Sequence, residues 1–206
     1  LPISDPAYQL PEPWRGDLIN APVLFVSSNP GWGPNSDCPT PSTPATQTLA
    51  FYNAGFPKCF PRDLDRNGHV TPSAIAFWSG IRARASQLYG VQRAAIVPGK
   101  DFALTEVVHC KSAREIGVRT ASKTCVNEHF KEIILLSNAR VVVILGNAAA
   151  DALGVRKVRT WRQEKWHGKV RIVLWLPHPN ARRKRSLFQN QITKVRIMLR
   201  SARRKA

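Results

Sequence analysis

The stretch Val23-Leu24-Phe25-Val26-Ser27-Ser28-Asn29-Pro30-Gly31-Trp32-Gly33-Pro34 decides the fold that we expect for this chain. Its four apolar residues, with a β-branched valine at each end, predict a buried strand of a parallel sheet. The Asn-Pro-Gly that follows is a strong turn signal. Asn29 is therefore presented at the carboxyl end of a strand, and in open α/β sheets that edge is where ligands bind.

The composition is that of a basic globular protein. The chain has 206 residues, of which 43% are hydrophobic, and its 31 Lys and Arg residues against 13 acidic residues give a formal net charge of +18. Such a charge first suggests a polyanionic partner, although a ribosome-associated or membrane-surface role would also suit it. No apolar run approaches the roughly 20 residues of a membrane-spanning helix, and no signal peptide is visible. We therefore expect a soluble intracellular protein, cytoplasmic and nucleoid-associated or nuclear, although Leu1 is not an initiator residue.

Hydrophobic periodicity divides the chain into alternating strands and helices. Proline after Thr71, followed by apolar residues at steps of three and four, indicates an amphipathic helix that begins at residue 72. We expect strands at 22–28, 104–108, 141–146 and 170–176, and helices at 72–89, 122–137, 147–153 and 186–206. Helices between successive strands predict a three-layer α/β sandwich around a four-stranded, mainly parallel sheet.

The remaining segments are read from their composition. Residues 1–20 contain four prolines and suit an extended N-terminal arm, and residues 34–62 form a long loop rich in Pro, Ser and Thr. Residues 161–169 suit a short irregular or hairpin connection that Gly168 closes. Residues 1–206 together form a single domain, with the basic helix 186–206 at its end.

Polar side chains follow three of the expected strands. Asn29 follows the first strand, Glu106 and His109 belong to the second, and His178 and Asn180 follow the last. Any one of these residues, taken alone, is more often a surface or capping residue than a functional one. Because parallel strands send their carboxyl ends to one edge, we expect the set to converge on one pocket.

Four short motifs that contain these residues resemble, in the same order, the motifs of the uracil-DNA glycosylase superfamily. They are Asn-Pro-Gly-Trp-Gly at 29–33, Glu-Val-Val-His-Cys at 106–110, Ile-Leu-Gly-Asn-Ala-Ala at 144–149 and His-Pro-Asn at 178–180. The first motif is most similar to the single-strand-selective and mismatch-specific branches. The second and third are more similar to the thermophile-type iron–sulfur branch. The resemblance covers roughly residues 22–185 and implies the fold of that superfamily.

The resemblance implies a monofunctional, monomeric DNA glycosylase that flips uracil or a related damaged base out of DNA and initiates base excision repair. Asn29 would position the attacking water through its amide carbonyl, and His178 would stabilise the negative charge that develops on the leaving base. The residues expected to contact the base are Phe51, Tyr52, Glu106, Ser28 and Gly31, with Phe51 or Tyr52 stacking on it.

The segment after His178 is expected to contact DNA. The loop from Asn180 to Arg183, with Arg182, would enter the duplex, and Lys184 and Arg185 would also bind DNA. Residues 182–206 contain ten basic residues and no acid. A run of charge is usually a solvated face, but a run beside the expected insertion loop is better explained by phosphate contacts.

Two positions depart from the superfamily's pattern. His-Pro-Asn stands where a His-Pro-Ser is usual, which removes a hydroxyl that can contact a DNA phosphate. Glu106 stands where the iron–sulfur branch has the Asn that reads the uracil edge. An amide both donates and accepts, whereas a carboxylate only accepts unless it is protonated. The identity of the excised base is therefore left open.

The four cysteines contain no CxxC pair. Cys110 and Cys125 occupy positions similar to two cluster ligands of the iron–sulfur branch, and Cys38 and Cys59 would have to supply the other two. We expect no cofactor and no metal, with a cluster through Cys110 and Cys125 as the alternative.

Two other classes of function compete with a glycosylase. Glu106 would also suit a DNA- or RNA-binding module that keeps the fold but has lost catalysis. An amidohydrolase or a nucleotide-binding α/β protein is the third class. The sequence has neither the glycine-rich phosphate loop nor the HxxEH-type metal spacing that this class uses.

Overall fold

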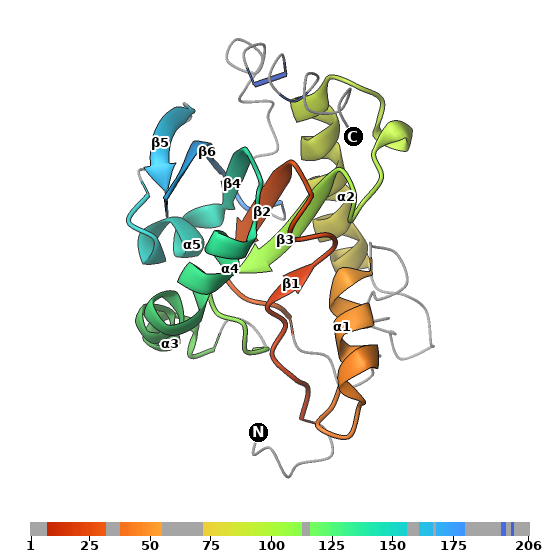
Figure 1. Cartoon of the computed structure of the whole chain (residues 1–206), viewed down its shortest axis with the longest axis vertical. Coiled ribbons are helices and arrows are strands. Elements are labelled where there is room, and N and C mark those ends of the chain that lie inside the picture. The colour runs from red at the N-terminus through yellow and green to blue at the C-terminus, as the bar shows by residue number, and fades with distance from the viewer. Residues whose placement is uncertain are drawn as a thin grey trace.

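One six-stranded sheet forms the centre of the molecule (Figure 1). The computed structural model describes residues 8–31, 38–54, 72–112, 116–155, 161–166, 168–179, 195–196 and 199, with the backbone alone at 72–76. The sheet order is β1-β3-β2-β4-β6-β5, in which β2, β3, β4 and β6 are parallel and the edge strands β1 and β5 are antiparallel. The strands are β1 (Trp14–Arg15), β2 (Val23–Ser27), β3 (Phe102–Glu106), β4 (Val141–Leu145), β5 (Arg162–Trp166) and β6 (Lys169–Leu176).

The expected parallel strands are confirmed, but the expected number of strands is wrong. Part of the N-terminal arm, Trp14–Arg15, pairs with β3, and the expected connection at 161–169 is a hairpin whose first strand is β5. Hydrophobic periodicity does not detect β1, because a strand of two residues is too short to show an alternation of apolar and polar side chains. It misses β5 because Arg162–Trp166 is polar and nowhere fully buried.

Helices cover both faces of the sheet, which gives the expected three layers (Figure 1). One face packs against α2, and the other packs against the α3–α4 helical run and α5. Every residue of β2, β3 and β4 is buried, as a two-sided environment requires. The helices are α1 (Ala45–Asn53), α2 (Pro72–Tyr89), α3 (Val118–Cys125), α4 (Lys131–Leu136) and α5 (Gly146–Ala152), with a π-helical segment, Val126–Phe130, joining α3 to α4 and a 3₁₀ turn at Arg93–Ala95.

The structure confirms one helix closely and corrects two other expectations. α2 spans the expected 72–89 and ends at Gly90, whose φ of 66° lets the chain leave the helix. The helix expected at 122–137 starts at Val118, directly after Gly117. The expected long loop at 34–62 contains α1. Within the described residues, no helix has both the length and the apolar character needed to cross a membrane.

A buried arginine closes the carboxyl end of α4. Arg171 on β6 is only 1% exposed. Its guanidinium donates to the backbone oxygens of Ala139 (2.6 Å), Ile134 (2.8 Å) and Ser137 (2.7 Å). Lys169 reaches the same helix end from a more exposed position and donates to the oxygens of Leu135 and Ser137. The last carbonyls of a helix have no partner within the helix, so these cations satisfy them.

Replacing Arg171 with Met should destabilise the protein by about 3 kcal/mol or more, because buried carbonyls would lose their donors. Lys169→Met is the matched control and should cost about 1 kcal/mol or less, because water can replace a partly exposed ammonium. Urea unfolding followed by circular dichroism measures both. An equal loss of unfolding free energy in the two variants would show that the buried guanidinium is not the main group that stabilises this helix end.

Candidate active site

The carboxyl ends of β3, β2, β4 and β6 lie along one edge of the sheet. Ser27 pairs with Glu106, and Leu145 pairs with Leu176. Asn29 lies two residues beyond the end of β2, and His178 lies two residues beyond the end of β6. Only β4 separates these two strands, so their backbones are about 10 Å apart, which is two inter-strand spacings. The edge therefore carries both residues that were expected to be catalytic.

The amide of Asn29 is held in one orientation by the turn and by the loop after β3. Its Nδ2 donates to the carbonyl oxygens of Pro30 (3.0 Å) and Ser112 (3.5 Å). Its Oδ1 accepts a longer bond of 3.4 Å from the hydroxyl of the buried Ser28. Gly31 forms a bridge with Ser112, which fastens the turn to that loop. With its nitrogen directed at two carbonyls, the amide keeps its oxygen as the side that can accept from a water.

The loop that carries His178 lies on α2. The imidazole stacks on the Phe77 ring, with centroids 5.3 Å apart and planes at 28°. Arg84 Nη2 donates to the carbonyl oxygen of Pro177 at 2.7 Å. A Cβ on Gly80 would lie 2.8 Å from the Cβ of Pro179, so the loop can pack this closely on α2 only because residue 80 has no side chain. Burial lowers the pKa of Arg84 to about 10, which leaves it charged at neutral pH.

Gly146 supports His178 from the opposite side. This glycine follows β4 directly, with a φ of 82° that other residues rarely adopt. A Cβ at this position would lie 3.2 Å from the Cβ of His178. The indole of Trp175 donates to the Gly146 carbonyl at 3.0 Å. The end of β4 is thus shaped to leave room for the imidazole between it and α2.

Glu106 lies at the same edge and faces the α2 side of the sheet. Side chains alternate along a strand, and Phe102 and Leu104, which have the same parity as Glu106, belong to the core cluster that contains α2. Glu106 is only 5% exposed. The edge therefore offers an amide, an imidazole and a buried carboxyl group from three strands.

Comparison with protein families identifies the group to which this edge belongs. The model of the uracil DNA glycosylase superfamily matches residues 13–199. The chain belongs to this superfamily. Comparison with curated proteins finds no match. The match spans all four motifs and also β1, which lies outside the range of the sequence-based resemblance, but it does not resolve the branch.

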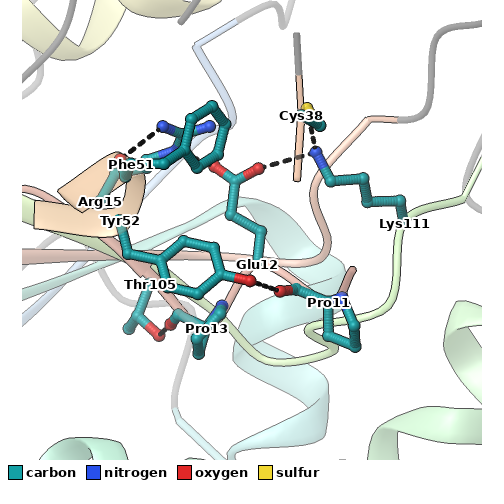
Figure 2. A network of polar contacts seen from close by, with 9 residues as sticks. All are labelled: Pro11, Glu12, Pro13, Arg15, Cys38, Phe51, Tyr52, Thr105 and Lys111. Atoms are coloured by element: carbon teal, nitrogen blue, oxygen red, sulfur yellow. Dashed lines mark hydrogen bonds and ion pairs between the residues drawn. The ribbon is translucent and has the colours of Figure 1, made fainter. Parts of the chain in front are cut away.

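Phe51 and Tyr52, expected to stack on a base, lie at the end of α1 beside the N-terminal arm (Figure 2). Tyr52 is buried against Trp14, and its hydroxyl donates to the Pro11 carbonyl at 2.6 Å. Burial and, to a lesser degree, the charge of Glu12 raise the pKa of Tyr52 to about 12. Phe51 is partly exposed, and the Arg15 guanidinium lies 3.4 Å from its ring centroid. In this structure both rings pack the arm onto the sheet.

His109 is buried on the α3 side of the sheet, away from the helix α2 that supports His178. It is 6% exposed, and its ring lies 6.2 Å from that of His129. Burial is the main cause that lowers the pKa of His109 to about 4, His129 lowers it further, and a hydrogen bond with the Glu106 backbone opposes the shift. The imidazole is therefore neutral at physiological pH and belongs to the core.

The cysteines do not assemble a metal site in the part of the chain that the structure describes. Cys125 is buried and Cys110 is exposed, and the two are near enough for the charge of Cys110 to raise the pKa of Cys125 further after burial has raised it. Cys38 contacts Lys111, and Cys59 lies outside the described residues. No group of three or more His, Cys, Asp or Glu side chains is placed there to hold an ion.

Sequence reasoning missed the α2 platform. Phe77, Gly80 and Arg84 are spaced i, i+3 and i+7, so they share one face of the helix. A glycine inside a helical pattern usually has a packing reason, and that signal was available at Gly80. The expected DNA-contacting residues, Asn180, Arg182, Arg183, Lys184 and Arg185, lie outside the described residues.

The buried imidazole of His109 should make stability depend on pH. Its pKa in the folded protein, about 4, lies below the ordinary value of 6.5, so the unfolded chain binds the proton first as the pH falls. The contribution, about 3 kcal/mol, is complete above pH 6.5 and is lost between there and about pH 4. In urea titrations, His109→Asn should flatten this dependence, whereas replacing the exposed His129 with Asn should leave most of it, because burial is the main cause of the lowered pKa of His109. A wild-type dependence that persists in His109→Asn would assign it to other groups.

Proposed function

We propose that this protein is a monofunctional glycosylase that removes uracil or a closely related base from DNA. The proposal rests on one observation: Asn29 and His178 follow two parallel strands at the same edge, separated by a single strand. Membership of the superfamily makes DNA the substrate class. The edge supplies two groups that hydrolysis of an N-glycosidic bond needs, one for the water and one for the departing base.

Asn29 positions the attacking water in this proposal. A neutral amide is too weak a base to create hydroxide, so the glycosidic bond must be largely broken before the water adds. Asn29 must therefore present its amide oxygen to the water in a fixed direction. The two carbonyls that accept from Nδ2 fix this direction, because they prevent the amide group from rotating by half a turn.

His178 stabilises the base as it leaves. Negative charge develops on a base oxygen as the bond breaks, and a donor aimed at that oxygen lowers the barrier more than it aids binding. The α2 platform on one side and Gly146 on the other hold the imidazole in place before the substrate arrives. Little reorganisation is then needed during the reaction, which is why such a donor is effective.

Glu106 is the group that would read the base. It lies on β3, next to the strand that leads to Asn29, and it is buried on the face where His178 lies. A protonated carboxyl both donates and accepts and matches the uracil edge, whereas a carboxylate requires a donor on the base. Because the two forms favour different bases, a panel of single-lesion oligonucleotides identifies the substrate.

A binding module without catalysis is the alternative, and Glu106 is the observation that favours it. The decisive assay incubates the protein with a uracil-containing oligonucleotide, treats the product with alkali and looks for strand scission. A strand that the protein leaves intact and that breaks only when alkali is added supports the glycosylase. Tight binding without scission on any base of the panel supports the module. A covalent adduct trapped by borohydride would contradict the monofunctional part of the proposal.

His178→Ala and Asn29→Ala should each lower the rate of base release about 100-fold or more while DNA affinity changes little, because both groups act mainly in the transition state. Single-turnover rates and binding by fluorescence anisotropy separate the two effects. Asn20→Ala is the control, since Asn20 is exposed and precedes the opposite end of β2. Parallel losses of affinity and rate would assign the residues to binding.

The support of His178 can be tested by a pair of glycines. Gly146→Ala and Gly154→Ala both place a side chain at a positive φ, 82° and 63°, and each should cost about 1–2 kcal/mol. Only at Gly146 does the new Cβ meet His178, because the space beside Gly154 is open. We expect base release to fall roughly tenfold or more in Gly146→Ala alone. Equal rates in the two variants would remove Gly146 from the site.

A further inference from the structure

A thiol and an amine lie in direct contact on the N-terminal side of the molecule. Cys38 Sγ and Lys111 Nζ are 2.6 Å apart and come from segments 73 positions apart in the chain. Figure 2 shows the two side chains directed at each other. Cys38 is partly exposed, whereas the Lys111 side chain is only 4% exposed. A small oxidant can therefore reach the sulfur from solvent, while the amine is held behind it.

A buried network of charges fixes the amine. Lys111 Nζ also donates to Glu12 Oε2 at 2.9 Å, and the other oxygen of Glu12 accepts from Arg15. Burial alone would raise the pKa of Glu12, but the charges of Lys111 and Arg15 outweigh it and leave that pKa below the ordinary carboxyl value. Arg15 in turn donates to the Phe51 carbonyl at 2.9 Å. Glu12 thus holds Lys111 against the sulfur and is a first acceptor for a proton from the amine.

We propose that Cys38 and Lys111 form an oxidation site at which peroxide creates a covalent sulfur–nitrogen cross-link between the two side chains. Cysteine sulfenic acids condense with neighbouring thiols or nitrogen nucleophiles when these are held in place. Reacting atoms held at about 3–3.5 Å are already in a near-attack arrangement. At 2.6 Å, Lys111 Nζ meets that requirement without any movement of the chain.

The chemistry balances with hydrogen peroxide as the only co-reactant. The thiolate of Cys38 attacks one peroxide oxygen, so an S–O bond forms and the O–O bond breaks; the sulfur is oxidised, and the second peroxide oxygen leaves as hydroxide. The extra proton of the Lys111 ammonium passes by way of Glu12 to this hydroxide and gives the first water. The lone pair of the neutral amine then attacks the sulfur, the S–N bond forms, the S–O bond breaks, and the hydroxide that leaves takes a proton from the nitrogen and gives the second water. Thiolate, ammonium and one peroxide therefore give a sulfenamide and two waters.

The cross-link would join two segments that flank the active-site edge. Cys38 follows the first motif in the chain, and Lys111 precedes Ser112, whose carbonyl holds the Asn29 amide. Joining positions 73 apart restricts the unfolded chain. The oxidised protein should accordingly unfold at a temperature several degrees higher than the reduced protein.

The test treats the purified full chain with a small excess of hydrogen peroxide and maps it by trypsin digestion and mass spectrometry. The expected product joins residues 16–58 to residues 101–114, because a modified Lys111 is not cleaved. This product should be two hydrogens lighter than the sum of the two peptides. Dithiothreitol should reverse the cross-link and remove the gain in unfolding temperature.

Three variants identify the atoms that react. Cys38→Ser removes the sulfur, and Lys111→Arg keeps the positive charge beside Glu12 but removes the amine, so both should abolish the cross-link. Cys110→Ser is the matched control: it removes an exposed thiol next to Lys111 and should leave the cross-link intact. Unfolding temperatures measured under reducing conditions show whether each variant is folded.

Several outcomes would overturn the proposal. They are a Cys38 sulfinic acid with normal cleavage at Lys111, a disulfide between Cys38 and Cys110, and a cross-link that survives in Lys111→Arg. A linked peptide that retains one oxygen would overturn the condensation step. None of these readouts depends on base excision, so the result stands apart from the proposed glycosylase activity.

Discussion

Burial of both faces of the parallel sheet is the constraint on which the site depends. Helices cover the two faces, and every residue of β2, β3 and β4 is buried. A polar side chain on such a strand can meet a substrate only where the strand ends. Asn29, Glu106 and His178 all lie at the carboxyl edge, and Gly146 lies there because the imidazole needs its space. The packing of the core therefore decides where chemistry can occur.

Several of the basic side chains hold the structure together. Arg171 and Arg84 donate to backbone carbonyls, and Arg15 and Lys111 pair with Glu12. These cations hold a helix end, the loop of His178 and the N-terminal arm, and they cannot at the same time contact phosphates. The formal charge of +18 thus overstates the basic surface that faces a nucleic acid. Salt dependence of DNA binding should reflect the remaining cations.

Four successive residues of the loop after β3 have four different surroundings. His109 is buried in the core, Cys110 is exposed, Lys111 faces Cys38 and Glu12, and Ser112 holds the amide of Asn29. Their side chains and backbone groups point in different directions from one short segment. A covalent change at Lys111 would therefore act directly on Ser112, the next residue, whose carbonyl holds the amide of Asn29.

Much of the fold and the residues of the edge were predictable from local pattern. The four parallel strands were found because strands covered on both faces are apolar runs, and α2 was found from its proline start and its apolar face. The order of the motifs indicated the superfamily that the family comparison shows. β1, β5 and α1 were missed because they are short or polar, and partners distant in the chain determine where they lie.

By itself, therefore, the sequence determined the class of fold, the superfamily and the placement of Asn29, Glu106 and His178 at strand ends. Only the tertiary structure decided what surrounds them. Phe77 stacks under an imidazole 101 positions away, Gly146 leaves space for that same ring, and Tyr52 turns its hydroxyl to the N-terminal arm. These contacts join segments that no local pattern relates, because packing depends on distances in space and periodicity records only distances along the chain.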